Sequence, residues 1–391
     1  MRKRLWQYAV HMLVTLAVLI PAAVVFGLMN DASLHYGDDP RAATISQDGP
    51  YIFIEADSSL SVSYVSGSRS EGYAVDRREF AKDSGKAAVS YYAFDSTSFA
   101  FPIRVEFAQP RVIHADGNKI LALSDIEGNY RALRDFLVAS GVIDRELRWT
   151  FGTGHLVLVG DVVDRGAFVT QVLWLLYKLE HEAAAQGGQV HLIIGNHELK
   201  AMQGDYLAAS EKYARVAAVL GRQQPDLYSS STVIGRWLES KNAMELINGV
   251  LFVHGGIHPD VAGSSLGLEE VNAVLRRNFR KTYFPRPTKD IEQLLVSTET
   301  GPSWYRGYFR ADLTQAQVES GLDLFNASAV VVGHTLQGKV NRQFDGRVIG
   351  IDVRHPSDDH KSWPSRRSEG LFIDGGRFYR VLDTGEMGEL K

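Results

Sequence analysis

Five short apolar runs in the chain each stop abruptly at a polar motif. The runs occupy residues 119–123, 155–159, 190–194, 249–253 and 327–332. Runs of this length with little alternation are typical of strands buried on both faces, and helix-like segments lie between the first of them. This succession predicts a layered α/β sandwich with flanking helices.

Two amphipathic segments support that prediction. Residues 130–140 place Leu133, Phe136 and Leu137 on one helical face, and Gly141 follows as a stop signal. Residues 168–185 repeat the pattern after the second apolar run. The closing stretch at 371–382 contains two adjacent glycines between apolar runs and predicts a β-hairpin.

The residues that follow the apolar runs carry the chemical information. They are Asp125, Asp161, Asn196, His254 and His334. Ligand groups gather beyond the carboxyl ends of strands in open α/β sheets, so these side chains can converge on one site. Oxygen and imidazole ligands in this mixture suit Mn, Fe or Zn, with Mg possible, and there is no phosphate-loop lysine motif. Metal-assisted chemistry is the simplest interpretation.

The composition excludes several other classes. The 391 residues carry a formal net charge of -4, so no strongly basic surface is available to hold a nucleic-acid backbone. The chain has no cysteine, which excludes disulfides, thiolate metal ligands and a cysteine nucleophile. We therefore expect no nucleic-acid partner.

The N-terminus predicts a membrane segment at residues 1–30. Arg2, Lys3 and Arg4 precede a stretch from 5 to 30 without acidic or basic side chains, which is long enough to cross a bilayer. An uncleaved anchor fits better than a cleaved signal peptide, which has a shorter apolar region and a clear small-residue cleavage site. Either reading places the rest of the chain outside the cytoplasm, on the periplasmic side.

Residues 31–115 differ in sequence pattern from residues 116–391. Short tyrosine-rich and β-branched runs alternate with Gly, Ser and Asp clusters, and Ile103, Val105 and Phe107 alternate as one face of a strand would. We predict a small β-rich accessory module here and a catalytic domain from 116 onward.

The motifs DxxGN, GDVVDRG, GNHE, HGG, WYRG and GHT occur in that order. Together they resemble the calcineurin-like metallophosphoesterase superfamily, specifically its phosphoprotein phosphatase branch. The stretch GPSWYRGY at 301–308 is most similar to the bacterial, Shewanella-type members. The resemblance covers residues 118–354 and leaves the N-terminal region outside it.

The resemblance implies a site for two divalent metal ions. Asp161 would bridge the ions, Asp125 would bind the first, and Asn196, His254 and His334 would hold the second. Such a pair clamps phosphoryl oxygens and lowers the pKa of a bound water, which then attacks in line.

Glu127 stands where the family usually has a histidine ligand of the first metal. Residues two apart on an extended segment point to the same side, so Glu127 can join Asp125 at that ion. An added carboxylate makes the site harder and favours Mn or Mg over Fe or Zn, so we expect manganese. The alternative is that Glu127 does not bind metal and the first site is weak.

The resemblance also implies roles in catalysis. His197 would donate a proton to the leaving group, and Asp164 would orient it. Arg165 and Arg306 would grip the phosphate, together with Asn196.

The expected reaction is hydrolysis of phosphate monoesters by metal-activated water. The resemblance suggests phosphoserine, phosphothreonine or phosphotyrosine on proteins, and small phosphate esters are also compatible with an extracytoplasmic enzyme. Cleavage of a diester or of a dinucleotide pyrophosphate is the alternative chemistry. A third possibility is a membrane-tethered binding protein with weakened catalysis.

Overall fold

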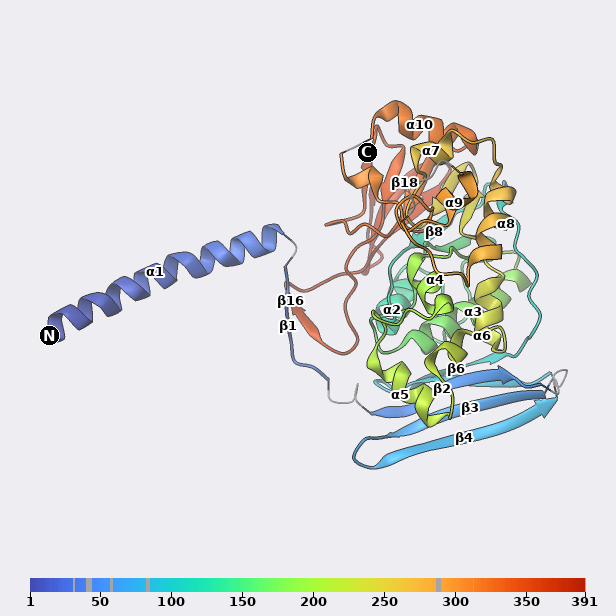
Figure 1. Cartoon of the computed structure of the whole chain (residues 1–391), viewed down its shortest axis with the longest axis horizontal. Helices are drawn as coiled ribbons and strands as arrows, with labels where there is room; N and C mark the ends of the chain where they lie inside the picture. Colours follow the sequence, from blue (N-terminus) through green and yellow to red (C-terminus); the bar gives the residue numbers. More distant parts are fainter. Residues whose placement is uncertain are drawn as a thin grey trace.

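The computed structural model of the chain describes residues 1–30, 32–39, 44–56, 59–81, 85–285, 290–311 and 313–390. Its main body contains two six-stranded sheets with helices around them, and one long helix extends away from it (Figure 1). The structure is therefore a mixed, layered α/β fold, as the apolar runs predict.

The first sheet has the strand order β10-β9-β8-β17-β18-β19. Strands β8, β9 and β10 run parallel, whereas β17, β18 and β19 continue the sheet in antiparallel pairs. The bounds are Ile120–Leu123 (β8), His155–Leu158 (β9), Gln189–Leu192 (β10), Glu369–Asp374 (β17), Arg377–Leu382 (β18) and Met387–Glu389 (β19). The predicted hairpin is confirmed as β17 and β18.

The second sheet has the order β14-β15-β13-β12-β11-β7. Strands β12, β13 and β15 are parallel, as are β11 and β7, while β11 runs antiparallel to β12 and β14 to β15. The bounds are Ile113–His114 (β7), Met244–Ile247 (β11), Val250–Val253 (β12), Ala329–Val332 (β13), Asn341–Gln343 (β14) and Val348–Gly350 (β15).

Most residues of the central strands are apolar because both of their faces are buried. Val157 and Val159 belong to an apolar layer that also contains Phe252 and Val331 from the second sheet. The alternate residues, such as Leu158, belong to the larger core shared with the helices. This double burial explains why the runs do not alternate with polar residues.

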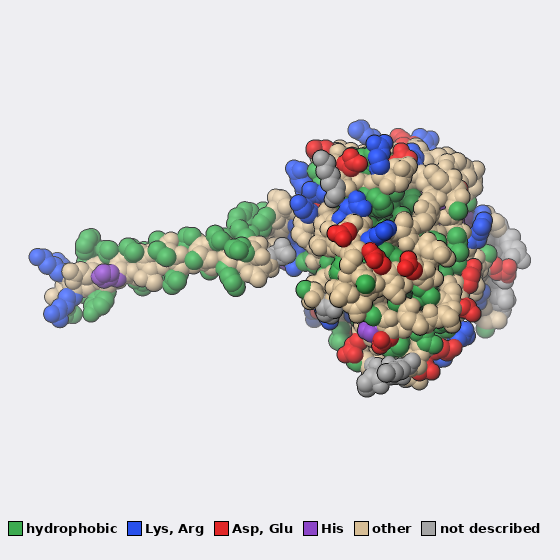
Figure 2. All heavy atoms as spheres, turned by 90° about the horizontal axis from the view of Figure 1, so that it is seen from above, with side chains coloured by type: hydrophobic (Ala, Val, Ile, Leu, Met, Phe, Trp, Pro, Cys, Tyr) green, Lys and Arg blue, Asp and Glu red, His purple; other side chains and the backbone are tan. Residues whose placement is uncertain are grey.

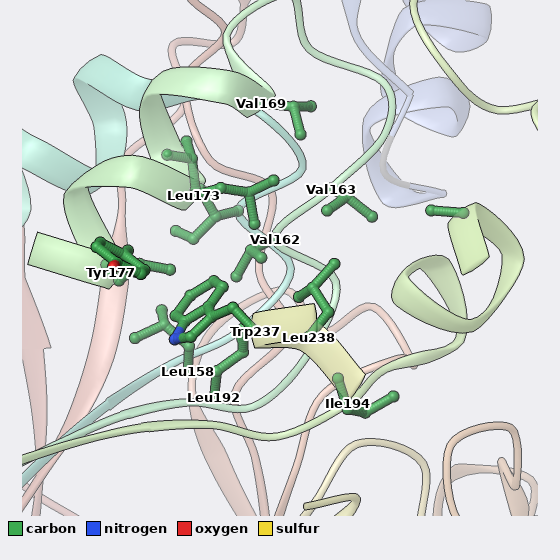
Figure 3. Packing of buried hydrophobic residues seen from close by; sticks show 14 of the residues in the cluster. Leu158, Val162, Val163, Val169, Leu173, Tyr177, Leu192, Ile194, Trp237 and Leu238 are labelled. Carbon is green, nitrogen blue, oxygen red and sulfur yellow. The ribbon is translucent and has the colours of Figure 1, made fainter. Parts of the chain in front are cut away.

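The helices build the outer core. Their bounds are Tyr130–Ala139 (α2), Val169–Ala185 (α3), Asn196–Gln203 (α4), Glu211–Val219 (α5), Val233–Glu239 (α6), Pro259–Ala262 (α7), Leu268–Asn278 (α8), Ile291–Leu295 (α9) and Gln315–Leu324 (α10), with 3₁₀ turns at Gln224–Tyr228 (η2) and Gly307–Phe309 (η3). Figure 3 shows Leu173 and Tyr177 of α3 beside Trp237 of α6, with Leu158 and Leu192 from the sheet in the same cluster.

The N-terminal strands pack directly onto α3. They form a three-stranded sheet from Ile45–Ile54 (β2), Ser59–Ser68 (β3) and Gly72–Ala81 (β4), and a pair from Ala87–Tyr92 (β5) and Thr97–Pro102 (β6). The rings of Phe101 and Trp174 stack with centroids 4.4 Å apart, and Trp174 Nε1 donates to the Pro50 carbonyl at 2.8 Å. The apolar side chains of this region are continuous with the main core.

The predicted strand face at Ile103, Val105 and Phe107 is wrong. Strand β6 ends at Pro102, and the stretch up to Pro110 has no regular structure. The Arg104 amide donates to the Tyr177 hydroxyl at 2.9 Å, and the Phe107 ring packs edge-on against the Tyr177 ring. A side chain of α3 thus takes the place that a neighbouring strand would have.

Helix α1 (Arg2–Met29) is exposed along its whole length. It is long and apolar enough to cross a membrane, and apolar side chains cover it in Figure 2, with basic ones at its far end. Strand β1 (Leu34–Tyr36) follows and pairs with β16 (Lys361–Trp363), so the chain after the helix joins the C-terminal part of the body.

Candidate active site

The polar motifs after the strands converge on one cavity of about 720 Å³. Asp125 follows β8, Asp161 follows β9 and His334 follows β13, and all three side chains line the cavity. Asn196, the first residue of α4, and His254, after β12, are buried beside it, and His254 contacts both Asp161 and Asn196. The structure therefore brings the predicted metal ligands together.

His254 directs its Nε2 toward two oxygen atoms. Its Nδ1 lies 2.7 Å from the carbonyl of Val159, which can only accept, so Nδ1 carries the proton. Its Nε2 then faces Asp161 Oδ2 at 3.0 Å and Asn196 Oδ1 at 3.1 Å. Burial opposes a charged ring, but Asp161 raises the pKa of His254 to about 10. When no ion is bound, a proton on Nε2 supplies the positive charge that these oxygens require, and this donor set suits a divalent metal that would replace that proton.

His334 completes this group. Its ligand atom, one from Asp161 and one from His254 all lie within 4.8 Å of one another. His334 Nε2 is 2.9 Å from the Trp304 carbonyl, which fixes the proton on that nitrogen and leaves Nδ1 as the acceptor. Burial and the nearby His254 hold the pKa of His334 far below its ordinary value, so the ring is neutral, as a metal ligand must be.

Carboxylates crowd the other side of the cavity. Asp125, Glu127, Asp161 and Asp352 all line it. Burial raises the pKa of Asp125 to about 6 and that of Glu127 to about 7, and the other carboxylates add to both shifts. Burial and these neighbours also raise the pKa of Asp352 well above its usual range. Such crowding is stable at neutral pH when cations lie between the carboxylates, so the residues fit bound divalent ions.

The motif pattern missed Asp352. It lies two residues beyond the end of β15, where a polar side chain interrupts the run RVIGIDV. The rule that identified the other ligands, a polar residue just past a buried parallel strand, applies here as well.

Glu127 lies in the cavity, where its Oε1 contacts Arg165 Nη1. The Arg165 guanidinium opposes the effect of burial on Glu127, and half of the arginine side chain remains open to solvent. Arg306 approaches from the turn before η3, contacts the His334 carbonyl and is partly buried. Both arginines therefore line the same cavity as the carboxylates.

His197 and Asp164 form a buried pair. The Nδ1 of His197 lies 2.7 Å from Asp164 Oδ2, and the His197 amide donates to Asp161 Oδ1 at 2.9 Å. Burial lowers the pKa of His197, but the Asp161 and Asp164 carboxylates outweigh it and raise that pKa above its ordinary value. Both carboxylates therefore favour the protonated form of this imidazole, which lines the cavity.

Glu198 anchors two site loops to each other. This fully buried side chain accepts from the amides of Asp161 and Gly195 with one oxygen, and from Val162 and Val163 with the other, at 2.9–3.2 Å. The sequence motifs predicted no role for Glu198. Its position as the third residue of α4 is the usual place for a capping glutamate, which is the signal that could have identified it.

Several site residues have left-handed backbone conformations. Positive φ angles of 50–70° occur at Asp125, Glu127, Asp161, Asp164, Arg165 and His334. Non-glycine residues adopt this region at a cost, and clusters of them are characteristic of functional sites.

The comparisons with known proteins agree with this geometry. Residues 118–338 match the family model of the calcineurin-like phosphoesterases. A crystal structure of the cold-active protein-tyrosine phosphatase of a psychrophilic Shewanella species superposes with a TM-score of 0.75 and 31% identity, covering 88% of this chain and 99% of that one.

Related sequences occur in distant organisms. An uncharacterised Schizosaccharomyces pombe protein is 30% identical over 60% of this chain and 72% of its own length. Shewanella-like protein phosphatase 1 of Plasmodium berghei is 26% identical over 56% of this chain and 61% of its own. Shewanella-like protein phosphatase 2 of Arabidopsis thaliana is 36% identical over 24% of each chain. This chain thus belongs to the calcineurin-like phosphoesterase family and is a metal-dependent phosphoester hydrolase.

Proposed function

We propose that the chain is a phosphomonoesterase that removes phosphate groups from proteins. The observation that carries this proposal is the His197–Asp164 pair in the wall of a carboxylate-rich cavity that two arginines also line. A protonated imidazole suits a leaving alkoxide, and two guanidinium groups suit a terminal phosphate. The likeness to protein phosphatases over 88% of the chain supports a phosphoprotein substrate.

Two divalent ions fit the cavity. Asp125 and Glu127 would hold the first, Asp161 would lie between both, and His254 and His334 would hold the second with Asn196. Bound there, the ions supply a nucleophilic water of low pKa and neutralise the phosphoryl oxygens. The carboxylates of the first position favour a hard ion, so we assign manganese to it. Asp352, which faces the same carboxylates, is a further candidate ligand of the first ion.

The protein groups perform the remaining steps. Arg165 and Arg306 orient the phosphate and offset the charge that builds on its equatorial oxygens. His197 donates its Nε2 proton to the leaving oxygen while Asp164 holds Nδ1, so the leaving alcohol departs neutral. The Glu127–Arg165 contact holds one arginine beside a carboxylate that would bind the first ion.

The apolar helix α1 supports a place at a membrane. Its 28 residues carry basic side chains only at the N-terminal end, which favours that end in the cytoplasm and the catalytic body on the opposite side. We infer a membrane anchor rather than a cleaved signal from the length of the apolar segment, because the apolar region of a signal peptide is shorter.

The test is a metal titration of the full-length chain in detergent micelles after chelation. We expect nitrophenyl phosphate hydrolysis to be absent without metal and to saturate with Mn²⁺, and phosphotyrosine or phosphoserine peptides to be cleaved as well. Faster hydrolysis of bis-nitrophenyl phosphate or of dinucleotides would replace the proposal by diester or pyrophosphate cleavage. Inactivity with Mn²⁺, Mg²⁺, Zn²⁺ and Fe²⁺ alike would favour a binding protein.

A further inference from the structure

A second group of ionisable side chains lies between the two sheets, away from the catalytic cavity. His114 ends β7 and Glu245 lies on β11 in the second sheet, while His155 begins β9 and His191 lies on β10 in the first. None of these four residues lines the cavity described above. Asp161 follows β9 at its other end, about 20 Å along an extended chain from His155.

Strand alternation explains why these side chains point inward. His155 shares its side of the strand with Val157 and Val159, His191 with Ile193, and Glu245 with Ile247. The apolar partners in these pairs belong to the layer between the sheets. The histidines and the glutamate therefore stand at the edge of an otherwise apolar interior, with exposed fractions of 0–7%. Charges in such a position must be compensated.

The protons on the ring nitrogens of this group can be assigned by starting from the contact between Asp116 and His155. Asp116 lies 2.9 Å from His155 Nε2 and can only accept, so this nitrogen carries a proton. Burial favours a neutral ring, so His155 Nδ1 accepts from His191 Nε2 at 2.9 Å. The other nitrogen of His191, Nδ1, lies 2.5 Å from the carboxylate oxygen Oε2 of Glu245.

This short contact holds a proton when no ion is bound, and a metal ion can displace that proton because its ligands bind in the deprotonated form. His114 Nε2 lies 3.7 Å from the same Glu245 oxygen, and ligand atoms from His114, His191 and Glu245 all lie within 4.8 Å of one another. The Arg111 carbonyl accepts from His114 Nε2 at 3.0 Å, so this nitrogen too would lose its proton on binding an ion. Two imidazoles, a carboxylate and one more position form a common ligand set for Zn²⁺.

We propose that His114, His191 and Glu245 hold a structural zinc ion that joins the two sheets. The surrounding contacts are those that support metal ligands: His191 donates its other nitrogen to His155, and Glu245 Oε1 accepts from Asn242 Nδ2 at 2.9 Å. The ion takes the place of the proton between His191 and Glu245. It is independent of the catalytic ions and of the reaction that they support.

The test counts zinc in a chain whose catalytic site is impaired. The full-length Asp161→Asn variant, produced with zinc in the medium and dialysed, is compared by elemental analysis with the double variants Asp161→Asn/His191→Gln and Asp161→Asn/Glu245→Gln. We expect one Zn²⁺ per chain in the single variant and its loss in both double variants. Asp161→Asn/His181→Gln is the matched control, because His181 is a partly buried histidine outside the group.

Thermal unfolding provides a second readout for variants that fold poorly. Zinc added to chelated Asp161→Asn should raise its Tm, because the ion binds only the folded chain, whereas Asp161→Asn/His114→Asn should show no shift. Equal zinc contents in the Asp161→Asn chain and its His191→Gln and Glu245→Gln derivatives, with no zinc-dependent Tm shift, would overturn the proposal. The group would then hold only a proton.

Discussion

The Asp164 carboxylate lies 2.7 Å from Nδ1 of His197 and so directs the opposite nitrogen of that ring into the cavity. His197→Asn should lower kcat by about 10²–10⁴-fold for phosphopeptides but far less for nitrophenyl phosphate, whose leaving group needs no proton. Metal content, measured by elemental analysis, should be unchanged. Equal losses on both substrates would contradict the acid role.

The same pair predicts a pH dependence. The Asp161 and Asp164 carboxylates raise the pKa of His197 and so extend the pH range in which the acid is protonated, and phosphopeptide hydrolysis should fall on the alkaline side as this proton is lost. Asp164→Asn removes one of the two carboxylates that raise this pKa, so the fall should begin at lower pH. A kcat profile for nitrophenyl phosphate serves as control, because its rate should lack this alkaline limb.

Glu127 can act through metal or through Arg165, and two variants separate these routes. Glu127→Gln should weaken Mn²⁺ activation by about 10–100-fold if the carboxylate is a ligand. Arg165→Lys keeps a positive charge beside Glu127 but loses the bidentate phosphate contact, so it should mainly raise KM and change the Mn²⁺ titration much less than Glu127→Gln does. A Glu127→Gln chain that binds two ions with unchanged affinity would rule out the ligand role.

Glu198 holds the loops that carry Asp161 and Asn196. Glu198→Gln replaces an acceptor oxygen by a donor amide that faces backbone N–H groups, so stability should fall by about 1–3 kcal/mol, and metal affinity should fall with it. Denaturant unfolding and Mn²⁺ titration measure the two effects. Glu211→Gln, at an exposed helix start, is the matched control and should change neither.

His355 predicts how stability depends on pH. Burial lowers the pKa of this neutral ring from 6.5 to about 4, so the unfolded chain binds more protons between these values. The contribution of His355 is complete above pH 6.5 and is lost as pH falls toward 4, by up to about 3 kcal/mol. Asp358, whose pKa burial raises to about 7, acts in the opposite direction. The difference between wild type and His355→Gln should therefore shrink between pH 7.5 and 5.

Asp48 connects the N-terminal strands to the catalytic body. This buried carboxylate accepts from Lys212 Nζ at 2.7 Å and from Gln171 Nε2 at 3.1 Å. Asp48→Ala leaves the lysine charge without its partner and should cost about 3 kcal/mol of unfolding free energy. Asp76→Ala removes an exposed pair with Arg78 and should have little effect. Equal stabilities would indicate that the N-terminal strands are a loosely attached module.

The sequence predicted the catalytic strands well because each is a short apolar run that ends at a motif. Asp125, Asp161 and His334 meet as expected, since parallel strands place their carboxyl ends at one edge. The strand predicted after Pro102 was wrong, because alternation alone cannot distinguish a strand from an irregular segment that packs on a helix.

Sequence motifs could not predict the contacts between segments that are distant in the chain. Asp352 joins the site only when β15 takes its place beside β13, and Glu198 acquires its four donors only when two loops meet. The buried histidines between the sheets carry no motif at all. Their spacing along the chain becomes informative once the pairing of β7 with β11 is known.

Strand β1 and the short segment before it keep the end of the apolar helix close to the cavity. Ser33 and His35 line the cavity, and Arg366 Nη2 donates to Ser33 Oγ at 2.6 Å. Only four residues lie between Met29 and Leu34, so these two residues are at most about 18 Å apart. With α1 inserted in a bilayer, the cavity would stay close to the lipid surface. Geometric reach would then favour some substrates over others, because phosphates carried on membrane-bound partners would meet the cavity most often.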